Sequence, residues 1–178
     1  QGTFGAYSHL AALLVDPKAE IIPCKTFDDC FNNAALEPEC RIIIPESNRI
    51  TGNIGIEYLI FKYRLNIYME HFQKIEHNLL GQSGAKLSDI KEVYSHAQGL
   101  SQCSKFIKDN NIAEHIRADT AGSAEMISKT KDKKQAAIAS SLSAKIYGLD
   151  IIKKNIENES GNLTRFLVMG KNIAQPEF

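Results

Sequence analysis

Short apolar runs alternate with helix-start signals along most of the chain, and this alternation limits the fold more than any other feature of the sequence. Apolar runs of strand length lie at 21–22, 41–44, 65–80, 93–94, 116–117, 136–139, 151–156 and 163–169. The segments between them include capped helical stretches such as 26–36, 120–130 and 140–147. Strands and helices that alternate at this spacing predict an α/β fold with mostly parallel sheets.

Several local signals sharpen this prediction. Pro45 should end the strand at 41–44 and begin a polar loop. Residues 65–80 alternate well enough to form one long strand, which would pass between two lobes. Ser140 should cap a helix that ends at Gly148.

The tripeptide Tyr-Ser-His occurs twice, at 7–9 and at 94–96, each time where a strand or loop gives way to a helix. Ser8 is placed to cap the first helix. Ser95 begins an S-x-x-Q capping box, which predicts a helix from Ser95 through Lys108. Chance explains two such short matches as well as a pair of similar lobes does. In the second interpretation each lobe presents a helix N-terminus to a shared crevice, which suits a ligand with two carboxylates.

The segment 161–170 is an apolar run of strand length with a glycine at each end. A polar pair, Thr164 and Arg165, stands near its start. One interpretation is a core strand whose first residues are simply solvated. The other is a strand whose first residues face a cleft, because a hydroxyl beside a guanidinium is unusual at the start of a buried strand.

Composition excludes several classes of function. The 178 residues carry 21 Lys and Arg against 21 Asp and Glu, so no global field attracts nucleic acid or an anionic membrane. No apolar run approaches the roughly 18–20 residues of a membrane span. The four cysteines, Cys24, Cys30, Cys40 and Cys103, fit no zinc-binding spacing. With no signal peptide visible, we expect reduced thiols, no metal and a cytoplasmic protein.

Several segments together resemble the catalytic domain of prephenate dehydratase, in the order in which that family has them. The matching stretches are 2–12, 93–103, 119–125, 136–149 and 162–168. The resemblance implies two α/β lobes, similar to type II periplasmic binding proteins, with the active site in the cleft between them. We expect the first lobe to hold residues 1–72 and 160–178, and the second to hold residues 73–159.

The resemblance also implies the residues of the site. Thr164 matches the threonine of the family's Thr-Arg-Phe motif, which is its principal catalytic residue. The positions implied to bind substrate are Ser8, Asn48, Ser95, Gln102, Arg165 and Phe166. Arg165 and Asn48 are expected to hold substrate carboxylates. Gln102 follows Ser95 by seven residues, so both should lie on one face of the predicted helix.

The segment 45–52 departs from the family's Pro-x-Glu-Asn-(Ser/Thr) pattern. Asn48 keeps its place, whereas Ser47 stands where the family has glutamate and Arg49 where it has serine or threonine. The role of that glutamate therefore does not carry over. Arg49 either adds positive charge for a substrate carboxylate or points into water, and the sequence leaves both possibilities open.

The activity implied is that of a hydro-lyase, prephenate dehydratase, which removes water and carbon dioxide from prephenate to give phenylpyruvate in phenylalanine biosynthesis. Because aromatisation of the ring drives the reaction, no metal or organic cofactor is implied. The small-molecule substrate is the expected partner, together with a second copy of the chain in a homodimer. Two alternatives stay open: an arogenate dehydratase, and a non-enzymatic module of the same fold that binds small anions or amino acids.

Family members commonly continue into an ACT domain, which binds phenylalanine and imposes feedback inhibition. The sequence up to Phe178 contains nothing that matches such a domain. We therefore expect the chain as given not to respond to phenylalanine.

Overall fold

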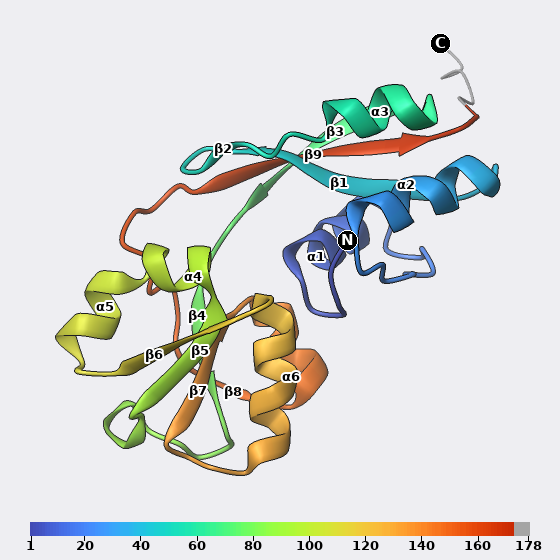
Figure 1. The fold of residues 1–178 in the computed structure, drawn as a ribbon. Helices are drawn as coiled ribbons and strands as arrows, with labels where there is room; N and C mark the ends of the chain where they lie inside the picture. The colour runs from blue at the N-terminus through green and yellow to red at the C-terminus, as the bar shows by residue number, and fades with distance from the viewer. Residues whose placement is uncertain (173–178) are drawn as a thin grey trace. The chain divides into compact units, whose positions relative to one another are not determined.

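Strand β9 (Leu163–Gly170) occupies the middle of an antiparallel sheet whose other strands come from the first half of the sequence (Figure 1). The computed structural model describes residues 1–172. Contacts divide the chain into two compact units. The first unit consists of Gln1–Gly2, Ser8–Lys74 and the chain from Asn162 onward, and the second of Thr3–Tyr7 and Ile75–Gly161.

The first unit is built around one sheet with the strand order β2-β1-β9-β3, in which every neighbouring pair is antiparallel. Its elements are α1 (Tyr7–Val15, whose first residue groups with the second unit), α2 (Phe27–Leu36), β1 (Arg41–Asn48), β2 (Gly52–Asn53), α3 (Glu57–Tyr63), β3 (Asn66–Lys74) and β9. The short strand predicted at 21–22 is wrong, because those residues lie in irregular chain between α1 and α2.

Helix α2 begins where the sequence predicts and supplies much of the first core. The Thr26 side chain accepts a hydrogen bond from the Asp29 N–H, and the Asp29 carboxylate accepts one from the Thr26 N–H. One face of the helix packs against the sheet in an apolar core that includes Phe31, Ala34, Ile42, Ile44, Leu167 and Met169.

Strand β1 does not stop at Pro45, so the predicted strand end is wrong. The register between β1 and β9 shifts between Pro45 and Ser47, and this bulge admits the proline, which cannot donate a ladder hydrogen bond. The strand then continues to Asn48 and turns into β2. The segment expected to be a loop is therefore partly a tight hairpin.

The long strand predicted at 65–80 is also wrong, because the chain forms two strands that belong to different sheets. Strand β3 ends at Lys74, and β4 (Asn78–Gly81) begins four residues later. Between them the backbone of His77 bonds to neither sheet. Its N–H donates to the Glu157 carboxylate at 3.0 Å, and its carbonyl accepts from the Ile156 N–H at 2.9 Å.

The second unit has a mixed sheet with the strand order β6-β5-β7-β4-β8. Its elements after β4 are η1 (Leu87–Asp89), β5 (Glu92–His96), α4 (Ala97–Gln102), α5 (Ser104–Asp109), β6 (Ala113–Arg117), α6 (Thr120–Thr130), β7 (Gln135–Ala139), α7 (Ser141–Tyr147) and β8 (Asp150–Lys153). Strand β5 runs parallel to β6 and β7, whereas β4 is antiparallel to β7 and β8.

The α/β class is confirmed, but the expectation of mostly parallel sheets is wrong. Alternation of strands and helices indicates parallel neighbours only where consecutive strands pair through a helical crossover. Here β9 inserts between β1 and β3, and β4 inserts between β7 and β8, and these long-range insertions make antiparallel pairs.

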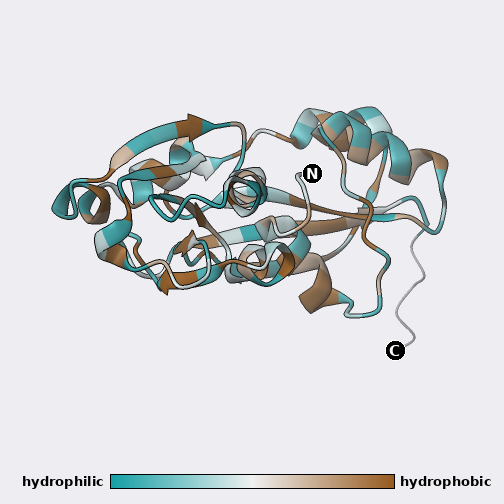
Figure 2. Cartoon of the chain, turned by 90° about the horizontal axis from the view of Figure 1, so that it is seen from below, coloured by the Kyte–Doolittle hydropathy of each residue, from teal (hydrophilic) through white to brown (hydrophobic). Residues whose placement is uncertain are grey.

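The helices carry both hydrophobic and hydrophilic residues, as expected for helices with one face on a sheet (Figure 2). Within residues 1–172, no helix combines the length and the apolar character needed to cross a membrane.

The predicted cap at Ser140 is confirmed and provides a test of stability. Its Oγ accepts from the Ser143 N–H at 3.1 Å and donates to the Gly5 carbonyl at 2.6 Å, and Gly148 ends the helix with a φ of 66°. The Ser143 hydroxyl donates to the same carbonyl at 2.9 Å.

We predict that Ser140→Ala lowers the free energy of unfolding by about 1 kcal/mol, the usual cost of losing a helix cap. Ser143→Ala is the matched control, because it removes one hydroxyl from Gly5 but leaves the cap. Urea denaturation of both variants measures the difference. Equal losses in the two variants would contradict a capping role for Ser140.

Candidate active site

Thr164 and Asn48 lie opposite each other on neighbouring strands of the first unit. The register of β1 and β9 pairs the two residues directly, so their side chains share one face of the sheet. The Asn48 Nδ2 donates to the Thr164 Oγ1 at 2.8 Å. Thr164 is buried, with 6% of its surface exposed. The structure therefore brings together two of the residues that the sequence assigned to the site.

The hydrogen bonds of the Asn48 amide fix its orientation. Its Oδ1 accepts from the backbone N–H groups of Ile50 and Thr51 at 2.9 and 3.1 Å. Its Nδ2 donates to the Asn162 Oδ1 and to the Thr164 Oγ1, both at 2.8 Å. Two acceptor and two donor positions are the full capacity of a carboxamide. The Asn48 amide therefore fixes the position of the Thr164 hydroxyl, and its role in holding a substrate carboxylate stays a prediction.

The contact with Asn48 also determines what the Thr164 hydroxyl can do. Because Oγ1 accepts from an amide, its own proton points elsewhere. Among the described residues, no acceptor takes that proton. The Thr164 hydroxyl is thus a hydrogen-bond donor whose oxygen is fixed by the Asn48 amide. A catalytic hydrogen-bond donor requires such a fixed position.

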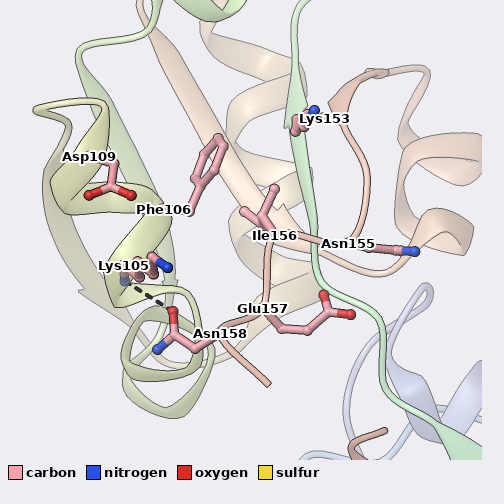
Figure 3. Close-up of a pocket in the computed structure, with 8 residues that line it drawn as sticks. All are labelled: Lys105, Phe106, Asp109, Lys153, Asn155, Ile156, Glu157 and Asn158. Atoms are coloured by element: carbon pink, nitrogen blue, oxygen red, sulfur yellow. Dashed lines mark hydrogen bonds between the residues drawn. The ribbon is translucent and has the colours of Figure 1, made fainter. Parts of the chain in front are cut away.

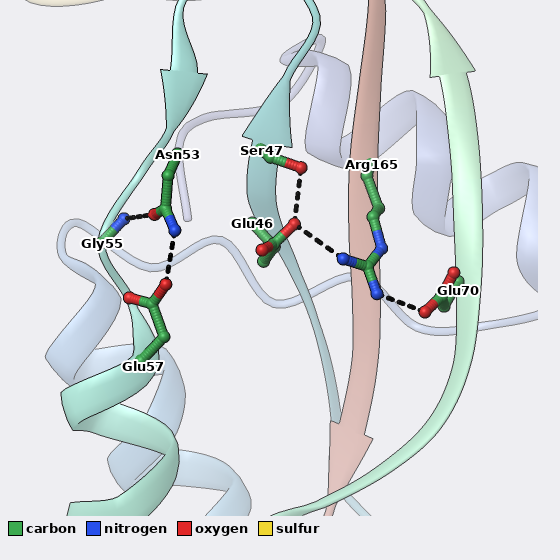
Figure 4. Close-up of polar contacts among 7 residues, drawn as sticks. All are labelled: Glu46, Ser47, Asn53, Gly55, Glu57, Glu70 and Arg165. Carbon is green, nitrogen blue, oxygen red and sulfur yellow. Dashed lines mark hydrogen bonds and ion pairs between the residues drawn. The ribbon is translucent and has the colours of Figure 1, made fainter.

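Arg165 points to the opposite face of the sheet from Thr164, because successive residues of a strand alternate. Its guanidinium lies between two carboxylates (Figure 4). Nη1 is 3.2 Å from the Glu46 Oε2, and Nη2 donates to the Glu70 Oε1 in a short contact. The Arg165 hydrogen bond lowers the pKa of Glu70. Arg165 links β1, β9 and β3, and the structure does not bring it together with Thr164, contrary to the prediction of a shared site.

Phe166 shares the sheet face of Thr164, two residues further along β9, and is 2% exposed. Its buried ring therefore lies on the same side of the sheet as the Thr164 hydroxyl. Its predicted contact with substrate stays a prediction.

The sequence missed three polar residues around Thr164. Gln73 on β3 pairs with Thr164 from the other side, and its Oε1 lies 3.3 Å from the His71 Nε2. Asn162 is 2% exposed and accepts from Asn48. The period of two along the predicted strand could have placed His71 and Gln73 on one face, but only the strand pairing shows that this is the face of Thr164.

Ser95 is not a helix cap, so that prediction is wrong. It lies within β5, is fully buried, and donates from Oγ to the Ile138 carbonyl at 2.7 Å. His96 caps α4 instead, accepting at Nδ1 from the Gln98 N–H at 3.3 Å. A Cβ at Gly99 would lie 2.8 Å from the Ser95 Oγ, so the glycine permits this close approach.

Gln102 ends α4 and makes a buried contact. Its Oε1 lies 2.8 Å from the His77 Nε2, and the His77 Nδ1 lies 3.0 Å from the Tyr7 Oη. Because Ser95 is in a strand and not in the helix, the two residues do not share a helix face as predicted. Gln102 and Ser95 are instead held by separate hydrogen bonds within the second unit.

Ser8 lies inside α1, which begins at Tyr7, so it does not cap the helix as predicted. Its hydroxyl donates to the Gln1 carbonyl at 2.7 Å. Arg49 donates its backbone N–H to the Leu163 carbonyl at 2.8 Å, and this bond holds the turn after β1 next to the start of β9.

A pocket of about 280 Å³ in the second unit contains none of these residues (Figure 3). It is lined by both acidic and basic side chains, among them Lys105, Asp109, Lys153 and Glu157. The Asn158 Oδ1 accepts from the Lys105 N–H at 3.0 Å within it. The predicted site residues therefore do not belong to this pocket.

Comparisons with known proteins identify the family and the fold of the chain. A sequence model described as prephenate dehydratase matches residues 1–174. The arogenate dehydratase/prephenate dehydratase 1 of Arabidopsis thaliana is 38% identical over 177 residues, which are 99% of this chain and 45% of that protein. The chain thus spans about half the length of this relative.

Two solved structures share the fold along nearly the whole chain. A quorum-quenching acylase has a TM-score of 0.91 and 32% identity, covering 100% of this chain and 65% of that one. The prephenate dehydratase of Staphylococcus aureus has a TM-score of 0.80 and 29% identity, covering 98% of this chain and 66% of that one. From the match to the family model and these relatives, the chain belongs to the prephenate dehydratase family.

Proposed function

We propose that this chain catalyses the decarboxylating dehydration of prephenate to phenylpyruvate, a hydro-lyase step in phenylalanine biosynthesis. The observation that carries the proposal is the hydrogen bond from Asn48 to the Thr164 Oγ1. It occupies the oxygen of Thr164 and leaves the hydroxyl proton to be donated. Membership of the prephenate dehydratase family supports the choice of substrate.

The chemistry needs a donor at the leaving oxygen. In prephenate the ring carbon–oxygen bond breaks as hydroxide departs, and the carbon–carbon bond to the ring carboxylate breaks as carbon dioxide departs. The electron pair from the second bond enters the ring, which becomes aromatic. A proton from solvent converts hydroxide to water. A threonine hydroxyl has no accessible pKa near neutrality, so Thr164 acts as a preorganised hydrogen-bond donor to the departing oxygen.

Holding the substrate carboxylates falls to other groups. Gln102 supplies amide N–H donors, and Phe166 limits the space beside Thr164. The Arg165 guanidinium is paired with Glu46 and Glu70 on the other sheet face, so we assign it a structural role in this proposal. Whether Arg49 or Ser8 meets the substrate stays a prediction, as does the cleft between the two lobes.

Arogenate is the second candidate substrate, because the Arabidopsis relative is named for both activities. It carries an amino group where prephenate has the side-chain ketone, and its dehydration yields phenylalanine. Incubation with each compound, followed by detection of phenylpyruvate or phenylalanine, tests both. Binding of either compound without turnover would refute the proposal and favour a non-enzymatic binding module.

We predict that Thr164→Val lowers kcat and kcat/KM together by about 10²–10³, the usual effect of removing one preorganised donor. Valine keeps the β-branched shape, so the strand should be little disturbed. Thr164→Ser keeps the donor and should retain much of the activity. Steady-state kinetics and thermal unfolding of both variants measure this. A folded valine variant with parental turnover would remove Thr164 from the chemistry.

Asn48→Asp should lower kcat as strongly as Thr164→Val. A carboxylate keeps the acceptor for Ile50 and Thr51, but at Nδ2 it replaces a donor by an acceptor. The Thr164 hydroxyl would then donate to Asp and turn away from substrate. Because both changes act on one hydroxyl, the double variant should be no slower than either single one. Additive losses would show that Asn48 acts independently of Thr164.

Arg165→Gln should lower the thermal unfolding midpoint and leave catalysis largely intact. It removes both ion pairs across three strands, whereas the control Glu70→Gln removes only one. Arg165→Gln should therefore be the less stable variant, with a kcat/KM no lower than that of Glu70→Gln. A selective rise in KM for Arg165→Gln would restore its predicted role in binding substrate.

A cytoplasmic location and a homodimer also stay predictions. Among the described residues all four cysteines are free thiols. Burial raises the pKa of Cys30 to about 11 and that of Cys103 to about 12, so both stay protonated. Light scattering after size-exclusion chromatography measures the oligomeric state.

A further inference from the structure

Asn162 is a buried asparagine that lies immediately before β9 and contacts the side chain that fixes the Thr164 hydroxyl. It is 2% exposed, and its Oδ1 accepts from the Asn48 Nδ2 at 2.8 Å. The same Nδ2 donates to the Thr164 Oγ1, also at 2.8 Å. Asn162 therefore shares the Asn48 amino group with the hydroxyl that the proposed reaction needs.

The backbone fixes the direction of every hydrogen bond in this set. The N–H groups of Ile50 and Thr51 can only donate, so the Asn48 atom that they meet is its oxygen. The Asn48 amino group therefore faces β9, and an amino group of an amide can only donate. The Asn162 atom that lies 2.8 Å from it is consequently an oxygen as well. Each of the two amides thus has a single orientation that satisfies these contacts.

The plane of the Asn48 amide is fixed by contacts and not by its covalent structure. The torsion that rotates an asparagine amide is soft, so the side chain alone would leave the plane free to tilt. The contacts of Oδ1 hold one edge of the plane. The two N–H bonds of Nδ2 point in different directions, and each has its own acceptor, Asn162 for one and Thr164 for the other. Both acceptors are therefore needed to hold the second edge.

The backbone keeps the two segments together independently of these side chains. The Arg49 N–H donates to the Leu163 carbonyl at 2.8 Å, and Asn48 pairs with Thr164 in the ladder between β1 and β9. A change in the Asn162 side chain should therefore leave the turn after β1 next to the start of β9. What such a change alters is how the Asn48 amide is held.

We propose that Asn162 is a positioning residue, which holds one N–H of Asn48 so that the other N–H stays directed at the Thr164 oxygen. The inference rests on the proposed function, in which the Thr164 hydroxyl donates to the departing oxygen. Without the acceptor at Asn162 the Asn48 amide tilts, and its bond to Thr164 weakens. Because the donation from Thr164 strengthens as charge builds on the departing oxygen, the loss falls on kcat more than on KM.

Two variants of nearly the same shape separate positioning from packing. Asn162→Asp keeps an oxygen for the Asn48 N–H, whereas Asn162→Leu keeps the branched shape and has no acceptor. Both lose the Asn162 amino group, and with it any bond that this group makes. We expect Asn162→Leu to lower kcat about 10-fold with a smaller change in KM, and Asn162→Asp to recover most of that loss. Since a carboxylate also repels an anionic substrate, the two variants are compared by kcat.

The effect should also depend on Thr164. In a Thr164→Val background, Asn162→Leu should lower kcat no further, because no hydroxyl is left to hold. Equal losses in the two backgrounds, or equal kcat values for Asn162→Asp and Asn162→Leu, would overturn the proposal. Thermal unfolding of all variants shows whether each of them is folded. If leucine prevents folding, Asn162→Ala removes the same acceptor and takes its place in both comparisons.

A spectroscopic measurement separates this inference from the proposed function. NMR of nitrogen-15-labelled protein resolves the two side-chain N–H protons of Asn48. Thr164→Val should shift mainly the proton that bonds to Thr164, whereas Asn162→Leu should shift both, because the whole amide tilts. A shift confined to the proton that faces Asn162 would refute the positioning role even in an active enzyme. If neither prephenate nor arogenate is turned over, the proposed function fails, while the NMR shifts still decide how Asn48 is held.

Discussion

The Asn48 carboxamide connects three parts of the first unit that are distant in sequence. Its oxygen closes the turn at Ile50 and Thr51, and its nitrogen reaches Asn162 and Thr164. A turn, the residue before β9 and the first residues of β9 therefore share one group. Since the capacity of this amide is filled, movement of Asn162 or Thr164 would break a hydrogen bond made by a buried side chain, which is costly. The orientation of the Thr164 hydroxyl follows from this constraint.

Strand alternation divides polar functions between the two faces of the same sheet. Thr164, Asn48 and Gln73 lie on one face, where uncharged groups orient a hydroxyl. Arg165 lies on the other, where its charge is balanced by Glu46 and Glu70. Adjacent residues of one motif thus lie in different surroundings, Thr164 among uncharged groups and Arg165 between two carboxylates.

Much of the fold can be predicted from local sequence signals. The predictions are wrong where pairing with strands distant in the sequence determines the structure. The caps at Thr26 and Ser140 need only nearby residues, and both were predictable. Ser95 has the same local signal, but pairing with β6 and β7 extends β5 through it. The sequence predicts a strand end at Pro45, because the bulge that accommodates this proline forms only when β1 pairs with β9. Likewise Thr164 was identifiable from its motif, whereas its contact with Asn48 depends on strand register, which no short segment specifies.

The central place of β9 has a consequence for how the protein is made. Ribosomes deliver the chain from the N-terminus, and domains begin to fold as they emerge. Strands β1 and β3 emerge early, yet both pair with β9, which follows the whole of the second unit. The second unit can complete its own sheet first, whereas the sheet of the first unit can be completed only after β9 has been synthesised. A translation product that stops before Leu163 would lack the strand that joins β1 to β3, so the first sheet could not form in the arrangement observed.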